Sequence, residues 1–213
     1  DYVEAKIKEI FSDIPAPTDP KAKDVIMIPG NQEPVIGIVS DPEAVNSTFE
    51  VYWKNEAMPE EFNNTLLGKI SDILKSLISS IMDERFSDIS AKADAPFIHA
   101  GFGIGNLCET MEVSMGNIAA HENDPVGAFK AFYTEIKKME KYGFSSDEIS
   151  RAKEDLLSYY ESAAKKASTR QNSELVQPLI DNFFDNYAYM EPEQEYEITK
   201  QLMSMLPDQA INQ

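Results

Sequence analysis

One long amphipathic helix that leads into a glycine-spaced hairpin constrains this sequence more than any other feature. Apolar side chains recur every three or four residues from Leu66 to Met82, and polar side chains fill the opposite face. Pro96 then excludes helix and pushes Ala95 toward extended backbone. A one-faced helix delivered onto a hairpin indicates a helix layer packed on a sheet. The apolar stripe consists of Leu66, Leu67, Ile70, Ile73, Leu74, Leu77, Ile78, Ile81 and Met82.

Strand patterns predict a single, mostly antiparallel sheet. Val25–Ile28 and Val35–Val39 are short apolar runs separated by turn residues, and Thr48–Lys54 alternates apolar and polar positions. Phe97–Gly116 has the pattern of a hairpin around Gly105-Asn106. We therefore expect an α+β fold whose sheet is covered mainly on one face by helices.

Capping signals define the helices of the second half. Asp124 and Pro125 open one helix, and Gly143 ends it. Ser145 and Glu148 form a capping box for the next helix. Two more helices are predicted over residues 173–187 and 193–206, the first interrupted or kinked at Pro178. The predicted inner faces are Val126, Phe129, Phe132, Ile136 and Met139 in the first helix, and Ile149, Ala152, Leu156, Tyr159 and Ala163 in the second.

The beginning of the chain has the pattern of another domain's end. A helical pattern runs to Ser12, and Pro15, Pro17 and Pro20 then form a stiff linker. The helix has no capping residue before it. We therefore expect residues 1–20 to be the terminal helix and proline linker of a preceding domain, and residues 21–213 to form one α+β domain.

Charge excludes some classes of partner. The formal net charge is -18, which repels phosphate backbones and anionic membrane surfaces, so we expect no nucleic-acid partner. No apolar run approaches the roughly 18 residues that a membrane-spanning helix needs, so no membrane span is predicted.

Residues that could carry chemistry are few. His121-Glu122 begins like a zinc-binding helix, but that motif needs a second histidine four residues on, where Pro125 stands. His121 is therefore interpreted as a solvated loop histidine rather than a ligand. His99 is interpreted as a packed or hydrogen-bonded strand histidine, and Cys108 as a small buried hydrophobe. No nucleophile and base pair can be assembled, so no catalytic, cofactor-binding or metal residue is assigned.

Several strings, taken in order, resemble the M16 family of zinc metallopeptidases (pitrilysin/insulinase type). Val3–Phe11 is similar to the last helix of the family's first domain, and Ser40–Glu43 to the entry into its second. Asp94–Phe97 is similar to the family's "daPF" turn. Tyr142–Lys153 is similar to a motif of the family at the junction between two helices. In that motif a glycine and a hydrophobic residue are followed by Ser or Thr, then Glu, and then Ala with Lys or Arg.

The resemblance implies an α+β unit of the LuxS/MPP-like metallohydrolase type, in a clamshell that encloses unfolded peptide. The family's zinc site is an inverted His-x-x-Glu-His motif plus a downstream glutamate in its first domain, and this sequence has no such motif. The segment therefore resembles the second, inactive domain. The resemblance places zinc in a catalytic domain outside this segment, and implies other domains of the same protein and unfolded peptide as partners.

Three functions follow from these patterns. The first is a non-catalytic domain that walls the peptide chamber of a zinc-dependent metalloendopeptidase and supports its catalytic domain. The second is a domain of a wholly inactive M16-like scaffold or partner subunit. The third is an unrelated acidic protein-interaction domain. A His-x-x-Glu-His motif roughly one domain length upstream would separate the first two.

Overall fold

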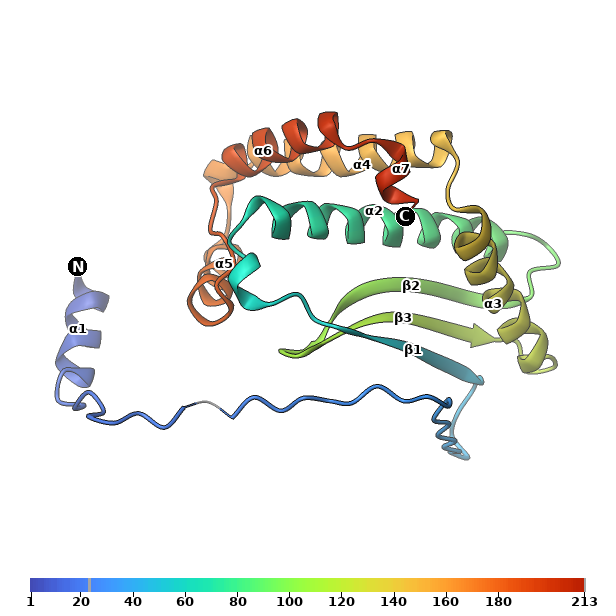
Figure 1. The fold of residues 1–213 in the computed structure, drawn as a ribbon, viewed down its shortest axis with the longest axis horizontal. Coiled ribbons are helices and arrows are strands. Elements are labelled where there is room, and N and C mark those ends of the chain that lie inside the picture. Colours follow the sequence, from blue (N-terminus) through green and yellow to red (C-terminus); the bar gives the residue numbers. More distant parts are fainter. Residues whose placement is uncertain (23, 213) are drawn as a thin grey trace.

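A three-stranded sheet is covered by two successive layers of helices (Figure 1). The computed structural model describes residues 1–22 and 24–212. The strands β1 (Thr48–Glu56), β2 (Phe97–Cys108) and β3 (Met111–Ala120) lie in the order β1-β3-β2, and both pairs are antiparallel. This arrangement confirms the predicted α+β fold with an antiparallel sheet.

Helices α2 and α3 pack on the sheet, and α4 and α6 pack on the outer side of α2. None of the helices in the described ranges combines the length and hydropathy needed to span a bilayer. The helices are α1 (Tyr2–Phe11), α2 (Leu66–Ser90), α3 (Pro125–Tyr142), α4 (Ser146–Lys165), α5 (Asn172–Asp185), α6 (Pro192–Met205) and α7 (Asp208–Ile211), with 3-10 turns at Glu60–Phe62 and Ala167–Thr169.

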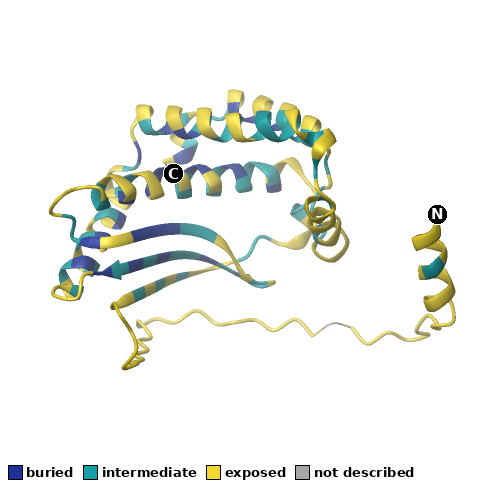
Figure 2. Cartoon of the chain, turned by 180° about the vertical axis from the view of Figure 1, so that it is seen from behind, coloured by how far each residue is buried: buried dark blue, intermediate teal, exposed yellow. Residues whose placement is uncertain are grey.

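Helix α2 supplies much of the core, as its apolar stripe predicts. Ile73, Leu77 and Ile81 are at most 2% exposed, and Phe86 extends the buried row beyond the predicted stretch. The predicted burial of the stripe is wrong at its start, because Leu66 is 62% exposed in the first turn of the helix. Figure 2 shows the buried positions along α2 and on the sheet that it covers.

The prediction of strands at Val25–Ile28 and Val35–Val39 is wrong. Residues 24–47 contain no strand, and Ile36 and Val39 are 80% and 96% exposed. The segment is extended, and it is held at one end by hydrogen bonds from Thr110 Oγ1 to Ile26 O and from Lys54 Nζ to Pro29 O. Strand preference reflects packing against neighbouring strands, and no described strand forms a ladder with this segment.

Helix α1 stands apart from the layers (Figure 1). It has no buried residue, and it is joined to β1 by the extended residues 12–47, which contain neither helix nor strand in their described part. The assignment of residues 1–20 to a preceding domain stays a prediction.

Caps at Asp124, Gly143 and Ser145 are confirmed. Asp124 Oδ1 accepts a hydrogen bond from Gly127 N at 2.8 Å, and Gly143 ends α3 with φ of 67°, which favours glycine. Ser145 and Glu148 form the predicted capping box of α4. Two predicted inner positions are wrong, because Val126 and Tyr159 project into solvent. Helix α5 continues through Pro178 without a break.

Gly116 of β3 allows α3 to approach the sheet closely. A Cβ atom at Gly116 would lie 2.2 Å from Cζ of Phe132, far inside any real contact distance. The ring of Phe132 is fully buried and stacks on Phe86 of α2, with centroids 4.9 Å apart. The glycine therefore lets one aromatic side chain join the strand to two helices.

Arg85 links α2 to the junction between α3 and α4. Its Nε donates to Glu148 Oε1 at 2.5 Å, and its Nη2 donates to Glu148 Oε2 at 3.0 Å and to Gly143 O at 3.1 Å. The Arg85 hydrogen bond lowers the pKa of Glu148 to about 2, and the hydrogen bonds from Ser145 act in the same direction. One guanidinium thus holds both the end of α3 and the first turn of α4.

We expect Leu77→Ala to lower the free energy of unfolding by about 2–5 kcal/mol, the range for emptying a buried leucine site. Leu66→Ala is the matched control, because Leu77 is 1% exposed and Leu66 is 62% exposed on the same helix. The control should lose less than about 1 kcal/mol. Urea titration measures both changes, and equal losses would contradict the packing of α2.

Glu148→Gln should destabilise the protein at neutral pH by about 1–3 kcal/mol, because Arg85 loses its charged partner. The folded pKa of Glu148 is about 2, below its ordinary value of 4.5. The stabilisation is therefore complete above about pH 4.5 and is lost as the pH falls toward 2. Denaturant titrations from pH 7 to 3 should show the difference between wild type and Glu148→Gln shrinking below pH 4.5. Glu140→Gln, at an exposed surface pair, should give a small difference throughout.

Candidate functional site

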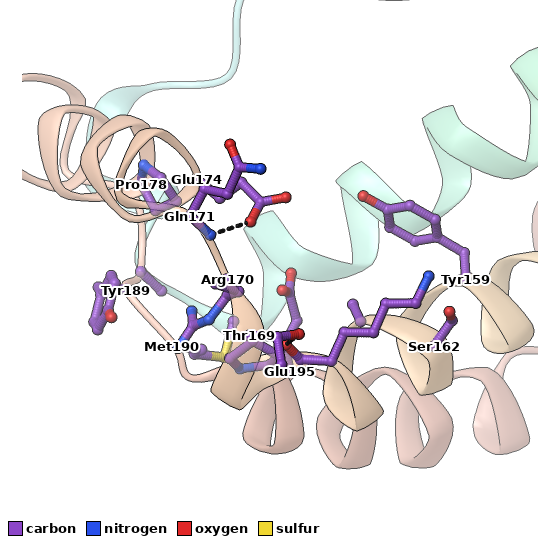
Figure 3. Close-up of a pocket in the computed structure, with 14 residues that line it drawn as sticks. Tyr159, Ser162, Thr169, Arg170, Gln171, Glu174, Pro178, Tyr189, Met190 and Glu195 are labelled. Atoms are coloured by element: carbon purple, nitrogen blue, oxygen red, sulfur yellow. Dashed lines mark hydrogen bonds between the residues drawn. The ribbon is translucent and has the colours of Figure 1, made fainter.

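One cavity lies where α4, α5 and the start of α6 meet (Figure 3). Its volume is about 650 Å³. Tyr159 and Ser162 reach it from α4, and Glu174 and Pro178 from α5 (Figure 3). The loop before α6 supplies Ala188, Tyr189 and Met190, and the cavity is also lined by Ala163, Lys166, Thr169, Arg170, Gln171, Pro192 and Glu195.

An ion pair between Arg170 and Glu191 stands at the wall of this cavity. Arg170 Nη2 donates to Glu191 Oε2 at 2.5 Å, and Tyr189 Oη donates to the other carboxylate oxygen at 3.0 Å. These hydrogen bonds lower the pKa of Glu191, and the Glu191 hydrogen bond raises the pKa of Arg170. Arg170 Nε also donates to Ala167 O at 3.1 Å, which orients the guanidinium. The guanidinium of Arg170 at this wall is therefore held in place by an ion pair and a hydrogen bond.

A second polar cluster joins α2, α4 and α6 beside the cavity. Lys69 Nζ donates to Glu195 Oε1 at 2.6 Å and to Tyr160 Oη at 3.4 Å, and the ammonium lies 4.8 Å from the Tyr160 ring centroid. Burial lowers the pKa of Lys69, but the hydrogen bond to Glu195 and the charge interactions outweigh it and raise that pKa. Burial raises the pKa of Tyr160. The lysine is therefore held charged, as a structural ion.

A smaller cavity of about 410 Å³ is also lined by the loop before α6. It shares Tyr189, Met190 and Glu195 with the larger cavity and adds Asp72 and Tyr187. Burial raises the pKa of Asp72, and the nearby Lys75 and Lys69 only partly offset this effect. The loop of residues 187–190 thus separates two polar and aromatic hollows.

The two hollows are lined by polar, charged and aromatic side chains. Among the described residues, neither cavity is lined by a histidine or a cysteine, and Lys69, Glu195 and Arg170 are held in ion pairs. A nucleophile needs an adjacent base that is itself oriented by a third group, and no such chain of contacts reaches Ser162 or Thr169. Thr169 Oγ1 instead donates to Lys166 O at 2.9 Å.

The histidines and the cysteine lie elsewhere. His121 is exposed in the loop before α3, as predicted, with Nε2 at 3.1 Å from Ala95 O. His99 is exposed on β2, so the interpretation as a packed histidine is wrong; a register shift between Phe97 and His99 changes the side-chain alternation there. Cys108 is only half-buried, and its hydrogen bonds with Thr110 lower its pKa. In residues 1–22 and 24–212, no group of three or more His, Cys, Asp or Glu side chains could hold a metal ion.

Sequence reasoning missed both cavities. Their residues come from α2, α4, α5, α6 and three connections, and no pattern of spacing joins them. The available signal was the concentration of basic and aromatic side chains in the short connections at residues 166–171 and 187–191, between the predicted helices.

No protein-family model and no curated protein matches the sequence. Solved structures do share the fold. The first half of the periplasmic protease PqqL from Escherichia coli matches with a TM-score of 0.79 and 19% identity, over 100% of this chain and 45% of that chain. The whole of the same protease matches with a TM-score of 0.76 and 18% identity, over 100% of this chain and 23% of that chain.

A predicted insulinase family protease from Yersinia pestis matches with a TM-score of 0.75 and 16% identity, over 99% of this chain and 45% of that chain. The chain therefore spans less than half of the length of the proteins that it matches. Taken with its sheet and two helix layers, these matches confirm that the chain has the fold of one α+β unit of the M16, insulinase-type proteases.

Proposed function

We propose that this chain is a non-catalytic unit of a larger M16-like zinc metallopeptidase, where it walls the peptide-binding chamber and supports the catalytic domain. The observation that carries the proposal is the match of the entire chain to part of a protease. All of it superposes on 45% of the first half of PqqL, so the neighbour has room for a separate catalytic unit.

The residues of this chain do not fit a catalytic zinc site. Such a site takes about three protein ligands and leaves one position open for water. Both histidines are exposed; His121 is hydrogen-bonded to Ala95 O in a loop and His99 lies on β2, and the described residues contain no metal-binding group. We therefore assign the zinc and the peptide-cleaving residues to another unit of the longer protein.

The site geometry supports a role in binding and support rather than chemistry. The two cavities offer Tyr159, Tyr187 and Tyr189 beside paired charges, a surface that suits contact with peptide. The net charge of -18 favours peptide over nucleic acid. Unfolded peptide and the other units of the same polypeptide are the partners that we propose.

The complete polypeptide that contains this chain should bind about one zinc ion and cleave unfolded peptides, while residues 1–213 alone should do neither. His121→Ala in the complete protein is the control, and it should leave both zinc content and cleavage unchanged. Zinc is measured by elemental analysis and cleavage with a quenched fluorescent peptide. Stoichiometric zinc in residues 1–213, or cleavage that His121→Ala abolishes, would overturn the proposal.

A further inference from the structure

Helix α5 carries an apolar stripe that no other part of the described chain covers. Phe183 and Phe184 are 80% and 68% exposed, and Val176, Leu179 and Ile180 are each more than 40% exposed. Positions 176, 179, 180 and 183 are three and four residues apart, so they share one face of the helix. The helix has no buried residue. An apolar surface of this kind on a soluble unit marks a contact site.

The stripe is turned away from the rest of the unit. Glu174 and Pro178 of α5 line the cavity of about 650 Å³ (Figure 3). At 100° per residue, these two positions lie roughly opposite Val176 and Phe183. The helix is held to the unit at its end, where Asn63 Nδ2 donates to Asp185 O at 2.8 Å. Packing within this chain therefore leaves the stripe free for another surface.

An isolated α5 would be a marginal helix in water. It has 14 residues and contains Pro178, which removes one intrahelical hydrogen bond. Helices shorter than about 12–15 residues have little stability without tertiary packing. Since α5 has no fully buried residue in its own unit, an external surface that covers the stripe supplies the packing that such a helix needs.

We propose that the apolar stripe of α5 docks on an apolar surface of another α+β unit of the same polypeptide. This inference rests on the proposed function. The chain corresponds to only 23% of the whole PqqL protease, so most of such a protein lies outside it and can present that surface.

The test uses the complete polypeptide and hydrogen exchange of residues 172–185. In the wild-type protein these amides should be protected, because docking stabilises α5. Phe183→Glu places a charge in the apolar centre and should speed their exchange by about tenfold or more. Gln177→Glu is the matched control, since it adds the same charge on the flank of the same helix and should preserve the protection.

Each other outcome decides against the inference. Unprotected residues 172–185 in a wild-type protein that cleaves peptide would refute the docking while leaving the proposed function intact. Protection that appears only with added peptide would make the peptide the occupant, and protection that grows with protein concentration would make it a second copy. A complete polypeptide with no further unit would refute the proposed function, and the docking with it.

Discussion

The position of α2 between the sheet and the outer helices is the constraint on which the rest of the structure depends. Its apolar side chains fill the core over β2 and β3. Its charged side chains add further links, among them Lys69 to Glu195 of α6, Arg85 to Glu148 of α4, and Asp83 Oδ1 to the amide of Phe102 at 2.9 Å. Because one helix contacts every layer, the unit has a single core rather than two.

The elements that could be predicted are those whose signals are local. Residues 124–148 contain a cap, a proline, a glycine and a capping box, and the structure has the helix ends there. The failures depend on what lies beside the segment. Val35–Val39 has the composition of a strand but pairs with no described strand, and Leu66 fits the stripe but lies in an exposed first turn of α2. Periodicity describes the face of an element and not whether a neighbour covers it.

The candidate site was beyond prediction for a different reason. A cavity forms where elements distant in the chain fail to fill the space between them, and its position depends on the angles at which helices pack. Lys69, Tyr160 and Glu195 are brought together from three helices, and each has an ordinary surface residue's pattern in the sequence. The one signal in the sequence for the cavities is the clustering of basic and aromatic residues in the connections at residues 166–171 and 187–191. The fold was recognisable because several local sequence motifs follow one another in the order found in the M16 family. The cavities have no such local motif.

The contact between Gly116 and Phe132 makes two distant positions change together. The ring sits where a side chain on β3 would begin, so any residue larger than glycine at position 116 requires a smaller one at position 132. With that smaller side chain, the stacking between position 132 and Phe86 would be lost. Proteins of this fold differ from the chain at more than four of every five positions. At that level of sequence divergence, Gly116, Phe132 and Phe86 can change only together, because a substitution on the strand requires matching substitutions on the two helices.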